Sequence, residues 1–380
     1  MTSNTIVQRA RENGNPVIQD NRATFIWEGD SAPRLISDLT DRDEHPKPFK
    51  RLTSNPSSPL TSSRGTFGRT NLKPATGISS PLGKTIWTCS LTVPRDAYIE
   101  YAFYDHATQD RFLDPWNAHS VNNGVGGRNN FFYMPETMPS PFSMRRADVP
   151  SGALTRHRVD TRYMQDHGER DVYLYKPAAR GPFPLLIVYD GPDYLNRGKL
   201  ATIVDNLIAD KRITPIAMAF LQNARTHRNV EYLCSDATIS WLDHEILPLA
   251  RQHLKLVDTH KQPGAYGVLG ASSGGLMSMY TGLRMPEIVG KVFCQSGVFA
   301  IEGRDTAVVD LVRHEHAHDI SIWMDVGQLD ELLEENRRMS GLLNEKNYNV
   351  TYREFSGGHN FTAWRDDLWH GLEKMFPLSR

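Results

Sequence analysis

A serine in this chain stands in a pattern that favours nucleophilic chemistry, Gly270-Ala271-Ser272-Ser273-Gly274. The apolar residues 265–269 before it have the length of a strand, and residues 276–283 after it follow a helical pattern. A strand, the G-x-S-x-G pattern and a helix together indicate a nucleophile elbow, which exposes the serine hydroxyl at the carboxyl edge of a sheet. The alternative is a Gly/Ser-rich loop that only joins two elements. We predict Ser272 as the nucleophile and the backbone N–H of Ser273 as a donor to the oxyanion.

A nucleophilic serine needs a base, and the base needs an acid that orients it. Two further strand-like runs follow the elbow, at residues 320–326 and 350–355, and each leads into a turn that contains glycine. Asp330 lies after the first run, and His359 follows two glycines after the second. Because both turns lie at the carboxyl ends of strands, we expect their side chains at the sheet edge that carries Ser272. The sequence therefore predicts a triad of Ser272, Asp330 and His359, in the chain order of α/β-hydrolases.

Other acidic residues compete with Asp330 for the role of the acid. One lies inside the strand at 320–326 and the others lie on the helix expected after it: Asp325, Glu331, Glu334 and Glu335. We favour Asp330 because a loop shortly after the strand can turn its side chain toward His359.

A second oxyanion donor is expected in the turn Tyr189-Asp190-Gly191, which ends a buried strand. Pro192 has no N–H, so the donor must be Gly191 or Asp193. We favour Gly191. The alternative is a turn with only a structural role.

Two arginines just after the strand that ends at Phe220 are candidates for contact with an anionic substrate group. Arg225 is the better candidate, because no acidic residue stands close to it in the sequence. Arg228 either contacts the substrate as well or pairs with Glu231 and holds the loop.

The stretch His314-Glu315-His316-Ala317-His318 matches the H-E-x-x-H pattern of zinc proteases. That chemistry needs both histidines on one face of a helix and a third ligand. The motif here falls at the end of a predicted helix and leads directly into a strand. We therefore expect no metal site and no cofactor.

From residue 153 onward, strand-like and helix-like runs alternate. Residues 155–163 and 169–176 predict an antiparallel pair, and residues 184–189 are apolar without alternation, as in a strand buried on both faces. Further strands are expected at 213–220 and 291–299, and helices at 200–209, 238–254, 306–315 and 362–375. This alternation predicts an α/β fold with a doubly wound, mostly parallel sheet over residues 153–380.

The earlier part of the chain shows short strand-like runs with turn signals between them. These runs predict an all-β sandwich over residues 21–135, preceded by a polar, poorly ordered tail at 1–20 and followed by a Pro-rich linker at 136–152. The Ser/Pro-rich stretch 55–83 is expected to be a long loop within that domain. The domain either packs passively or shapes the substrate site.

Composition limits the classes of function. The formal net charge of −1 gives no reason to expect a nucleic acid or a membrane as the main partner. Three widely separated cysteines fit a reducing compartment better than a disulfide framework. The first twenty residues lack an apolar core of a signal peptide, and no apolar run approaches the roughly 20 residues of a spanning helix. We expect a cytoplasmic protein.

Several of these stretches resemble the enterochelin (enterobactin) esterase family. Gly357-Gly358-His359-Asn360 with Trp364 is similar to the family's G-G-H-D…W-R ending, and residues 189–191 and 227–234 resemble other signatures of the family. Weaker similarity continues at the N-terminus, for example over residues 23–27 and 38–40. In one respect the chain departs from the pattern, since Asn360 stands where Asp is common.

The resemblance implies an α/β-hydrolase with an immunoglobulin-like N-terminal domain, and a serine esterase that opens a catecholate siderophore ester. It implies Asp330 as the acid, because the family's G-x-x-Asp/Glu pattern falls on that position, and Trp364 is taken as a substrate contact beside Arg225 and Arg228. Any iron would arrive with the substrate. The alternatives are a serine esterase of feruloyl or S-formylglutathione type, or a non-catalytic binding protein on the same fold.

Overall fold

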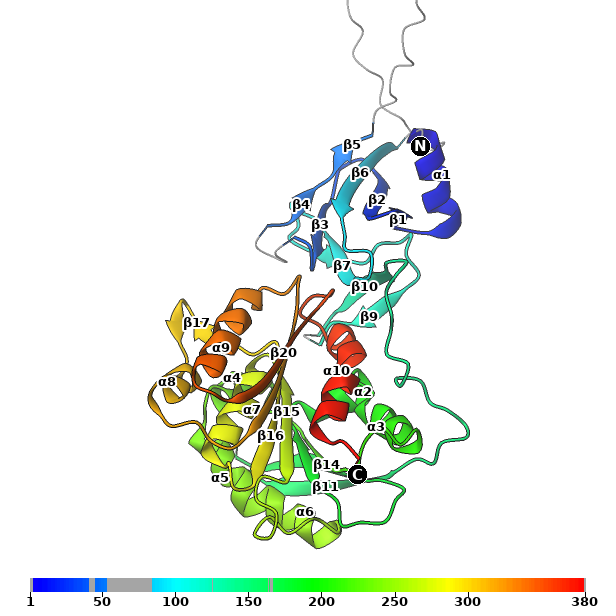
Figure 1. The fold of residues 1–380 in the computed structure, drawn as a ribbon. Coiled ribbons are helices and arrows are strands. Elements are labelled where there is room, and N and C mark those ends of the chain that lie inside the picture. Colours follow the sequence, from blue (N-terminus) through cyan, green and yellow to red (C-terminus); the bar gives the residue numbers. More distant parts are fainter. Residues whose placement is uncertain are drawn as a thin grey trace, which may run out of the picture. The chain divides into compact units, whose positions relative to one another are not determined.

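The computed structural model describes residues 3–40, 45–52, 84–124, 126–162, 164 and 167–378. The chain divides into two compact units, Met1–Thr137 and Met138–Arg380. Figure 1 shows the helices and strands of each unit, coloured along the sequence. The loop predicted over residues 55–83 lies outside the described residues.

Among its described residues, the first unit combines one helix with short antiparallel strands in two sheets. The sheet orders are β1-β2-β6-β5 and β4-β3-β7-β10-β9, with β8 paired to β7. Phe25 of β2 packs edge-on against Tyr101 of β7, with ring centroids 4.8 Å apart, so aromatic side chains join the two sheets as in a sandwich. The elements are α1 (Ser3–Asn13), β1 (Val17–Gln19), β2 (Arg22–Gly29), β3 (Arg34–Ser37), β4 (Lys47–Pro48), β5 (Lys50–Arg51), β6 (Thr85–Thr92), β7 (Tyr98–Tyr104), β8 (Arg111–Phe112), β9 (Ser120–Asn122) and β10 (Arg128–Tyr133).

The expectation of a poorly ordered tail at residues 1–20 was wrong. Helix α1 occupies much of this segment, and its Val7 and Ala10 are buried in a small core with Ile26 of β2. Apolar residues spaced three apart on an otherwise polar segment were enough to attach it to the sandwich.

The second unit is built on one large sheet with the order β11-β12-β14-β13-β15-β16-β19-β20. Strand β12 is antiparallel to both of its neighbours, and the pairs from β14 to β20 are parallel. The predicted α/β fold with a mostly parallel sheet is therefore confirmed. The strands are β11 (Ala153–Asp160), β12 (Glu169–Lys176), β13 (Leu185–Val188), β14 (Ala217–Leu221), β15 (Tyr266–Ala271), β16 (Val289–Gln295), β19 (Ser321–Gly327) and β20 (Asn349–Phe355), beside a small hairpin of β17 (Ala300–Ile301) and β18 (Arg304–Asp305).

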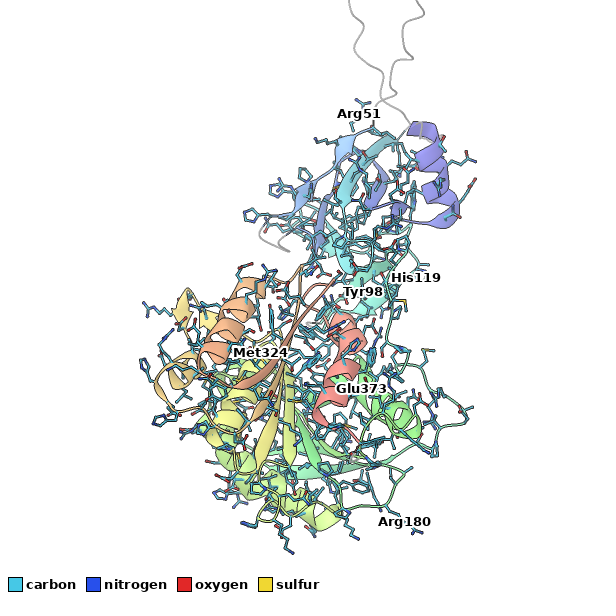
Figure 2. All side chains as sticks on the ribbon, in the orientation of Figure 1. Arg51, Tyr98, His119, Arg180, Met324 and Glu373 are labelled. Atoms are coloured by element: carbon cyan, nitrogen blue, oxygen red, sulfur yellow. The ribbon has the colours of Figure 1, made fainter. Side chains whose placement is uncertain are left out.

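Helices cover both faces of this sheet (Figure 1). Neighbouring residues of β13 show why both faces must be covered, because Leu185 and Ile187 enter one core while Leu186 and Val188 enter the other. Met324 of β19 is likewise completely buried (Figure 2). One face carries α2 (Gly191–Asn196), α3 (Leu200–Ala209) and α10 (Phe361–Met375); the other carries α4 (Arg228–Tyr232), α5 (Asp236–Trp241), α6 (Leu247–His253), α7 (Ser273–Arg284), α8 (Ala307–His314) and α9 (Leu333–Glu345).

The segment expected to be a linker packs onto the second unit. Phe142 is buried in the core that contains α3 and α10, and its carbonyl accepts a hydrogen bond of 2.7 Å from the Asn206 side chain. Within the described residues, no helix has both the length and the apolar character needed to cross a membrane. The three cysteines, Cys89, Cys234 and Cys294, are free thiols.

Candidate active site

Ser272 stands between β15 and α7 in a strained backbone conformation. Its φ and ψ angles are 59° and −126°, a region that residues with a side chain rarely adopt. The turn is tight, because a Cβ atom on Gly270 would lie 2.2 Å from the carbonyl oxygen of Gly274. The Ser272 N–H donates to the carbonyl of Gln295 at the end of β16, with a distance of 2.9 Å. This geometry matches the nucleophile elbow that the sequence predicts.

Asp330 and His359 are brought together by the loops after β19 and β20. These loops bond to each other through the N–H of Leu329 and the carbonyl of Gly357, at 3.0 Å. They approach so closely that a Cβ atom on Gly327 would lie 2.1 Å from the same carbonyl oxygen. The Nδ1 atom of His359 lies 3.1 Å and 3.0 Å from the two carboxylate oxygens of Asp330.

The Asp330–His359 contact fixes which nitrogen of the ring carries the proton. A carboxylate can only accept, so Nδ1 donates, and Nε2 is the basic nitrogen of the neutral ring. The Asp330 side chain is fully buried and that of His359 is 14% exposed. Burial alone would raise the pKa of Asp330, but the charge and hydrogen bond of His359, with hydrogen bonds from Leu332 and Ser296, lower it below its usual value. Asp330 is thus ionised at neutral pH.

Three of the four competing acids are engaged elsewhere, whereas Glu331 lies beside Asp330 and His359. Asp325 is completely buried and accepts hydrogen bonds from the side chains of Gln295 and Trp323. Burial and the neighbouring Asp367 raise the pKa of Asp325 well above its ordinary value. Glu334 pairs with Arg337, and Glu335 accepts from the backbone N–H groups of Phe299 and Ala300.

Gly191 is the first residue of helix α2, an element that the sequence did not predict. The preceding Asp190 has a left-handed backbone with φ of 52°, and its carbonyl accepts from the N–H groups of Asp193 and Tyr194. The N–H of Gly191 belongs to the first turn of the helix, where N–H groups have no partner within the helix. Phe220 and Leu221 leave no space for a side chain at Gly191. Asp193 already donates its N–H to the carbonyl of Asp190. Of the two candidate donors to the oxyanion, Gly191 is therefore the one whose N–H has no partner within the helix.

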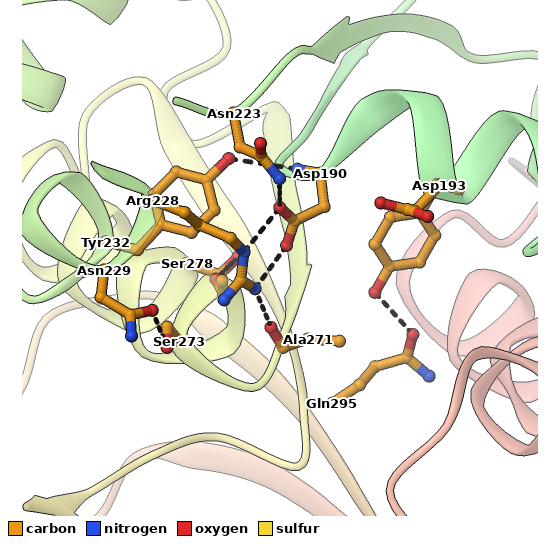
Figure 3. Close-up of polar contacts among 12 residues, drawn as sticks. Asp190, Asp193, Asn223, Arg228, Asn229, Tyr232, Ala271, Ser273, Ser278 and Gln295 are labelled. Carbon is orange, nitrogen blue, oxygen red and sulfur yellow. Dashed lines mark hydrogen bonds and ion pairs between the residues drawn. The ribbon is translucent and has the colours of Figure 1, made fainter. Parts of the chain in front are cut away.

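An ion pair connects this turn to the elbow (Figure 3). Arg228 donates from Nε to one oxygen of Asp190 at 2.8 Å and from Nη2 to the other at 2.6 Å. The same Nη2 atom donates to the carbonyl of Ala271, the residue before Ser272, at 3.2 Å. Asp190 is held further by the side chain of Asn223 at 2.6 Å and by the hydroxyl of Tyr232, which accepts from its N–H at 3.2 Å.

The expected pairing of Arg228 with Glu231 was wrong, and a contact of Arg228 with the substrate stays a prediction. Its guanidinium contacts Asp190 and does not pair with Glu231. Glu231 instead binds Arg170 through two hydrogen bonds of 2.5 Å in a buried pair. Arg228 thus pairs with Asp190, 38 residues away in sequence, and Glu231 pairs with Arg170, 61 residues away. The two residues do not pair with each other, although they lie only three residues apart.

Arg225 differs from Arg228 in its surroundings. It is exposed, has a left-handed backbone with φ of 53°, and lies in the short 3₁₀ helix Arg225–His227 after β14. Its guanidinium contacts no acidic side chain among the residues that the structure describes. Arg225 therefore remains a candidate for binding an anionic group.

Trp364 is not placed as a substrate contact. Its side chain is buried, with 3% of the residue exposed, and its ring packs edge-on against that of His359, with centroids 4.8 Å apart. Its indole N–H donates to the hydroxyl of Ser296 at 2.9 Å. Asn360 caps helix α10 by accepting from the N–H of Ala363 at 2.9 Å.

Four polar residues of this region were missed by the sequence analysis. Asn223 and Tyr232 hold Asp190, Ser296 accepts from the indole N–H of Trp364, and Asn229 accepts from the hydroxyl of Ser273 at 3.1 Å. Their position in the chain could have identified them, because all four lie in segments that follow parallel strands, and ligand sites form at the carboxyl ends of such strands.

No residue group here is assigned to a metal. Helix α8 ends at His314, so His314 and His318 do not share a helical face. Asp330, Glu331 and His359 bring potential ligand atoms within 4.8 Å of one another, and Nδ1 of His359 is already in contact with the Asp330 carboxylate.

Comparison with known proteins agrees with this architecture. The esterase family model, described as "Putative esterase", matches residues 164–375, more than half of the chain. The iron(III) enterobactin esterase of Dickeya dadantii is 28% identical over 262 residues, which cover 62% of this chain and 59% of that protein. The chain therefore aligns with only part of the length of this relative.

Solved structures show the same fold. The ferric enterobactin esterase of Salmonella typhimurium superposes with a TM-score of 0.76 and 18% identity, covering 97% of this chain and 98% of that one. A ferulic acid esterase from Anaeromyces mucronatus covers 62% of this chain and 95% of its own, with a TM-score of 0.52 and 15% identity. With its elbow, its α/β sheet and the match over residues 164–375, this chain belongs to the esterase family.

Proposed function

We propose that this protein is a serine esterase that hydrolyses carboxylic esters with Ser272, His359 and Asp330. Ser272 Oγ attacks the ester carbonyl carbon while Nε2 of His359 takes the hydroxyl proton. The imidazolium then gives this proton to the leaving alcohol as the C–O bond breaks and an acyl-enzyme remains. Water, deprotonated by His359, attacks the acyl-enzyme, and the carboxylic acid and free Ser272 result.

The backbone N–H groups of Ser273 and Gly191 stabilise the oxyanion in both steps. They lie in the first turns of α7 and α2, where unpaired N–H groups and the helix dipole favour negative charge. Asp330 orients the ring and stabilises its positive charge. The hydrogen bond between buried Asp330 and His359, on loops at the same sheet edge as the strained Ser272, is the observation that carries this proposal.

We further propose that the substrate is a catecholate siderophore ester. The relative from Dickeya dadantii and the structure from Salmonella typhimurium are enterobactin esterases, and the likeness to the latter extends over nearly the whole chain. Iron would be cargo of the substrate, and the reaction would occur in the cytoplasm. Exposed Arg225 is a candidate to bind an anionic group of such a ligand.

The second candidate is an esterase for an aryl ester such as a feruloyl ester. Its support is the similarity in fold between 62% of this chain and a ferulic acid esterase. Both candidates use the same triad and differ in the substrate that is turned over.

A substrate panel separates the two. Hydrolysis of enterobactin, with and without iron, is followed by chromatography beside methyl ferulate and p-nitrophenyl acetate, and kcat/KM is compared. The siderophore proposal expects enterobactin to exceed both simple esters. A higher kcat/KM for methyl ferulate supports the second candidate, and no turnover of any ester by pure protein contradicts both.

A further inference from the structure

Gln295 is a completely buried polar residue at the carboxyl end of β16. In the sheet it lies between Ala271, the residue before Ser272, and Asp325 of β19. Burying a side-chain amide is unfavourable unless its nitrogen and its oxygen are both hydrogen-bonded. The partners of this amide therefore show what Gln295 holds.

The Gln295 amide has one orientation that satisfies its neighbours. Its Nε2 atom lies 3.2 Å from the carbonyl oxygen of Trp364 in α10 and 3.1 Å from each carboxylate oxygen of Asp325. A carbonyl oxygen can only accept, so the amide atom that faces it is the donating nitrogen. The amide oxygen Oε1 then faces the hydroxyl of Tyr194 in α2, which donates to it at 2.9 Å (Figure 3).

The backbone of the same residue holds the nucleophile elbow. The carbonyl of Gln295 accepts from the N–H of Ser272 at 2.9 Å. Gln295 is thus hydrogen-bonded to the elbow, to α2, to β19 and to α10. Helix α2 begins at Gly191, Asp330 follows β19 and His359 precedes α10, so these are the elements that position the proposed triad and the second oxyanion donor.

The contact with Tyr194 bears most directly on the oxyanion. Tyr194 lies on the same short helix as Gly191, the first residue of that helix. The other proposed donor, Ser273, is the residue after Ser272. Gln295 therefore joins the two donors, one through its side chain and the other through its backbone. Their separation matters, because both N–H groups must lie about 2.7–3.1 Å from the place where the oxyanion forms.

We propose that Gln295 is a positioning residue that sets the distance between the two oxyanion donors and that Tyr194 acts through it, which rests on the proposed esterase function. Gln295 and Tyr194 are 0% and 1% exposed, so neither contacts substrate. The ion pair of Arg228 and Asp190 joins the same turn to Ala271. Loss of the Gln295 link should therefore weaken the oxyanion site without abolishing it.

The test compares kcat and KM for p-nitrophenyl acetate in Tyr194→Phe, Gln295→Met and the double variant. Loss of a whole oxyanion donor costs about 100- to 1000-fold in kcat, so Tyr194→Phe, which only loosens one, should cost about 3- to 10-fold and leave KM within about twofold. Gln295→Met keeps the length of the side chain but removes both polar ends, and kcat should fall about 10- to 100-fold. The double variant should be no slower than Gln295→Met, because Tyr194 acts through the amide.

Tyr266→Phe is the matched control. Tyr266 is also 1% exposed, and its hydroxyl also donates to a neutral oxygen, the carbonyl of Val257, at 2.8 Å. It is the first residue of β15, at the opposite end of the strand from Ser272. Tyr266→Phe should therefore lose about as much stability as Tyr194→Phe and keep the parent kcat. A melting curve for each variant ensures that folded protein is compared.

A second measurement reports on the oxyanion itself. An aryl trifluoromethyl ketone forms a hemiketal with Ser272, and the oxygen anion of this adduct needs the same two donors as the transition state. The Ki of the ketone should therefore rise by the same factor as kcat falls in Tyr194→Phe and stay unchanged in Tyr266→Phe.

Several outcomes would overturn the inference. They are an unchanged kcat in Tyr194→Phe, a rise in KM at constant kcat, an equal fall of kcat in Tyr266→Phe, or losses that multiply in the double variant. If Gln295→Met does not fold, Tyr194→Phe decides with its control.

Failure of the proposed function is distinguishable from failure of this inference. If the parent hydrolyses no ester, the proposed function fails, and the positioning role is then read from the backbone amide NMR signals of Gly191 and Ser273. Tyr194→Phe should shift both signals and Tyr266→Phe neither. Signals that do not move in Tyr194→Phe contradict the role.

Discussion

Replacement of Arg228 is the perturbation that separates its structural role from substrate binding. Arg228→Gln removes both hydrogen bonds to Asp190 and the one to Ala271, which join the Gly191 turn to the elbow. The Asp190 side chain is 3% exposed, so it is left as a buried carboxylate without its cation. We expect lower stability and a lower kcat, with little change in KM.

The size of both effects follows from the contacts. Breaking a buried ion pair costs about 3–5 kcal/mol, but the Arg228 side chain is 25% exposed and water replaces part of the contact, so about 2–3 kcal/mol is expected. This corresponds to a fall in Tm of roughly 5–10 °C. Loss of one oxyanion donor costs about 100- to 1000-fold in kcat. Because Asn223 and Tyr232 still hold Asp190, a fall of about 10- to 100-fold is expected.

The assay uses p-nitrophenyl acetate, which is neutral, beside an ester with an anionic acyl group. Arg228→Gln should lower kcat for both substrates alike. Arg225→Gln is the control, because this exposed arginine should affect only KM for the anionic ester. If Arg228→Gln raised KM for the anionic ester and kept kcat on the neutral one, Arg228 would be a substrate-binding residue and the reasoning would be refuted.

Three further results are expected. Ser272→Ala should reduce esterase kcat by about a millionfold at unchanged Tm, and a residual rate above about a thousandth of the parent would exclude Ser272 as the nucleophile. Asp330→Asn should lower kcat about ten-thousandfold, whereas exposed Glu331→Gln should be mild; a larger loss at Glu331 would reverse the assignment of the acid. EDTA should leave hydrolysis of an iron-free ester unchanged, and inactivation that zinc reverses would restore the zinc interpretation of residues 314–318.

Features of the site that depend on local sequence could be predicted. The G-x-S-x-G pattern between a strand and a helix located the strained turn at Ser272, and the turns after two later strands located Asp330 and His359. The turn and the Asp330–His359 contact follow from local patterns because the carboxyl ends of parallel strands meet at one edge, whereas the catalytic roles of these residues stay predictions.

Features that depend on contacts between distant strands could not be predicted. Arg228 binds Asp190 at the end of β13 and not the nearby Glu231, since sequence spacing carries no information on which strands are neighbours. Trp364 was taken as a substrate contact, but its amphipathic side chain turns inward, where its N–H finds Ser296. The inward-facing direction depends on the rotation of α10, which short motifs do not specify.

The central claim is that Ser272 is a nucleophile activated by His359. It is tested most directly by treating the pure protein with a fluorophosphonate and locating the adduct by peptide mass spectrometry. The account predicts one adduct, on Ser272, that forms rapidly in the parent and at least about a thousandfold more slowly in His359→Ala. An adduct on another residue, or labelling of Ser272 at the same rate without His359, would contradict it.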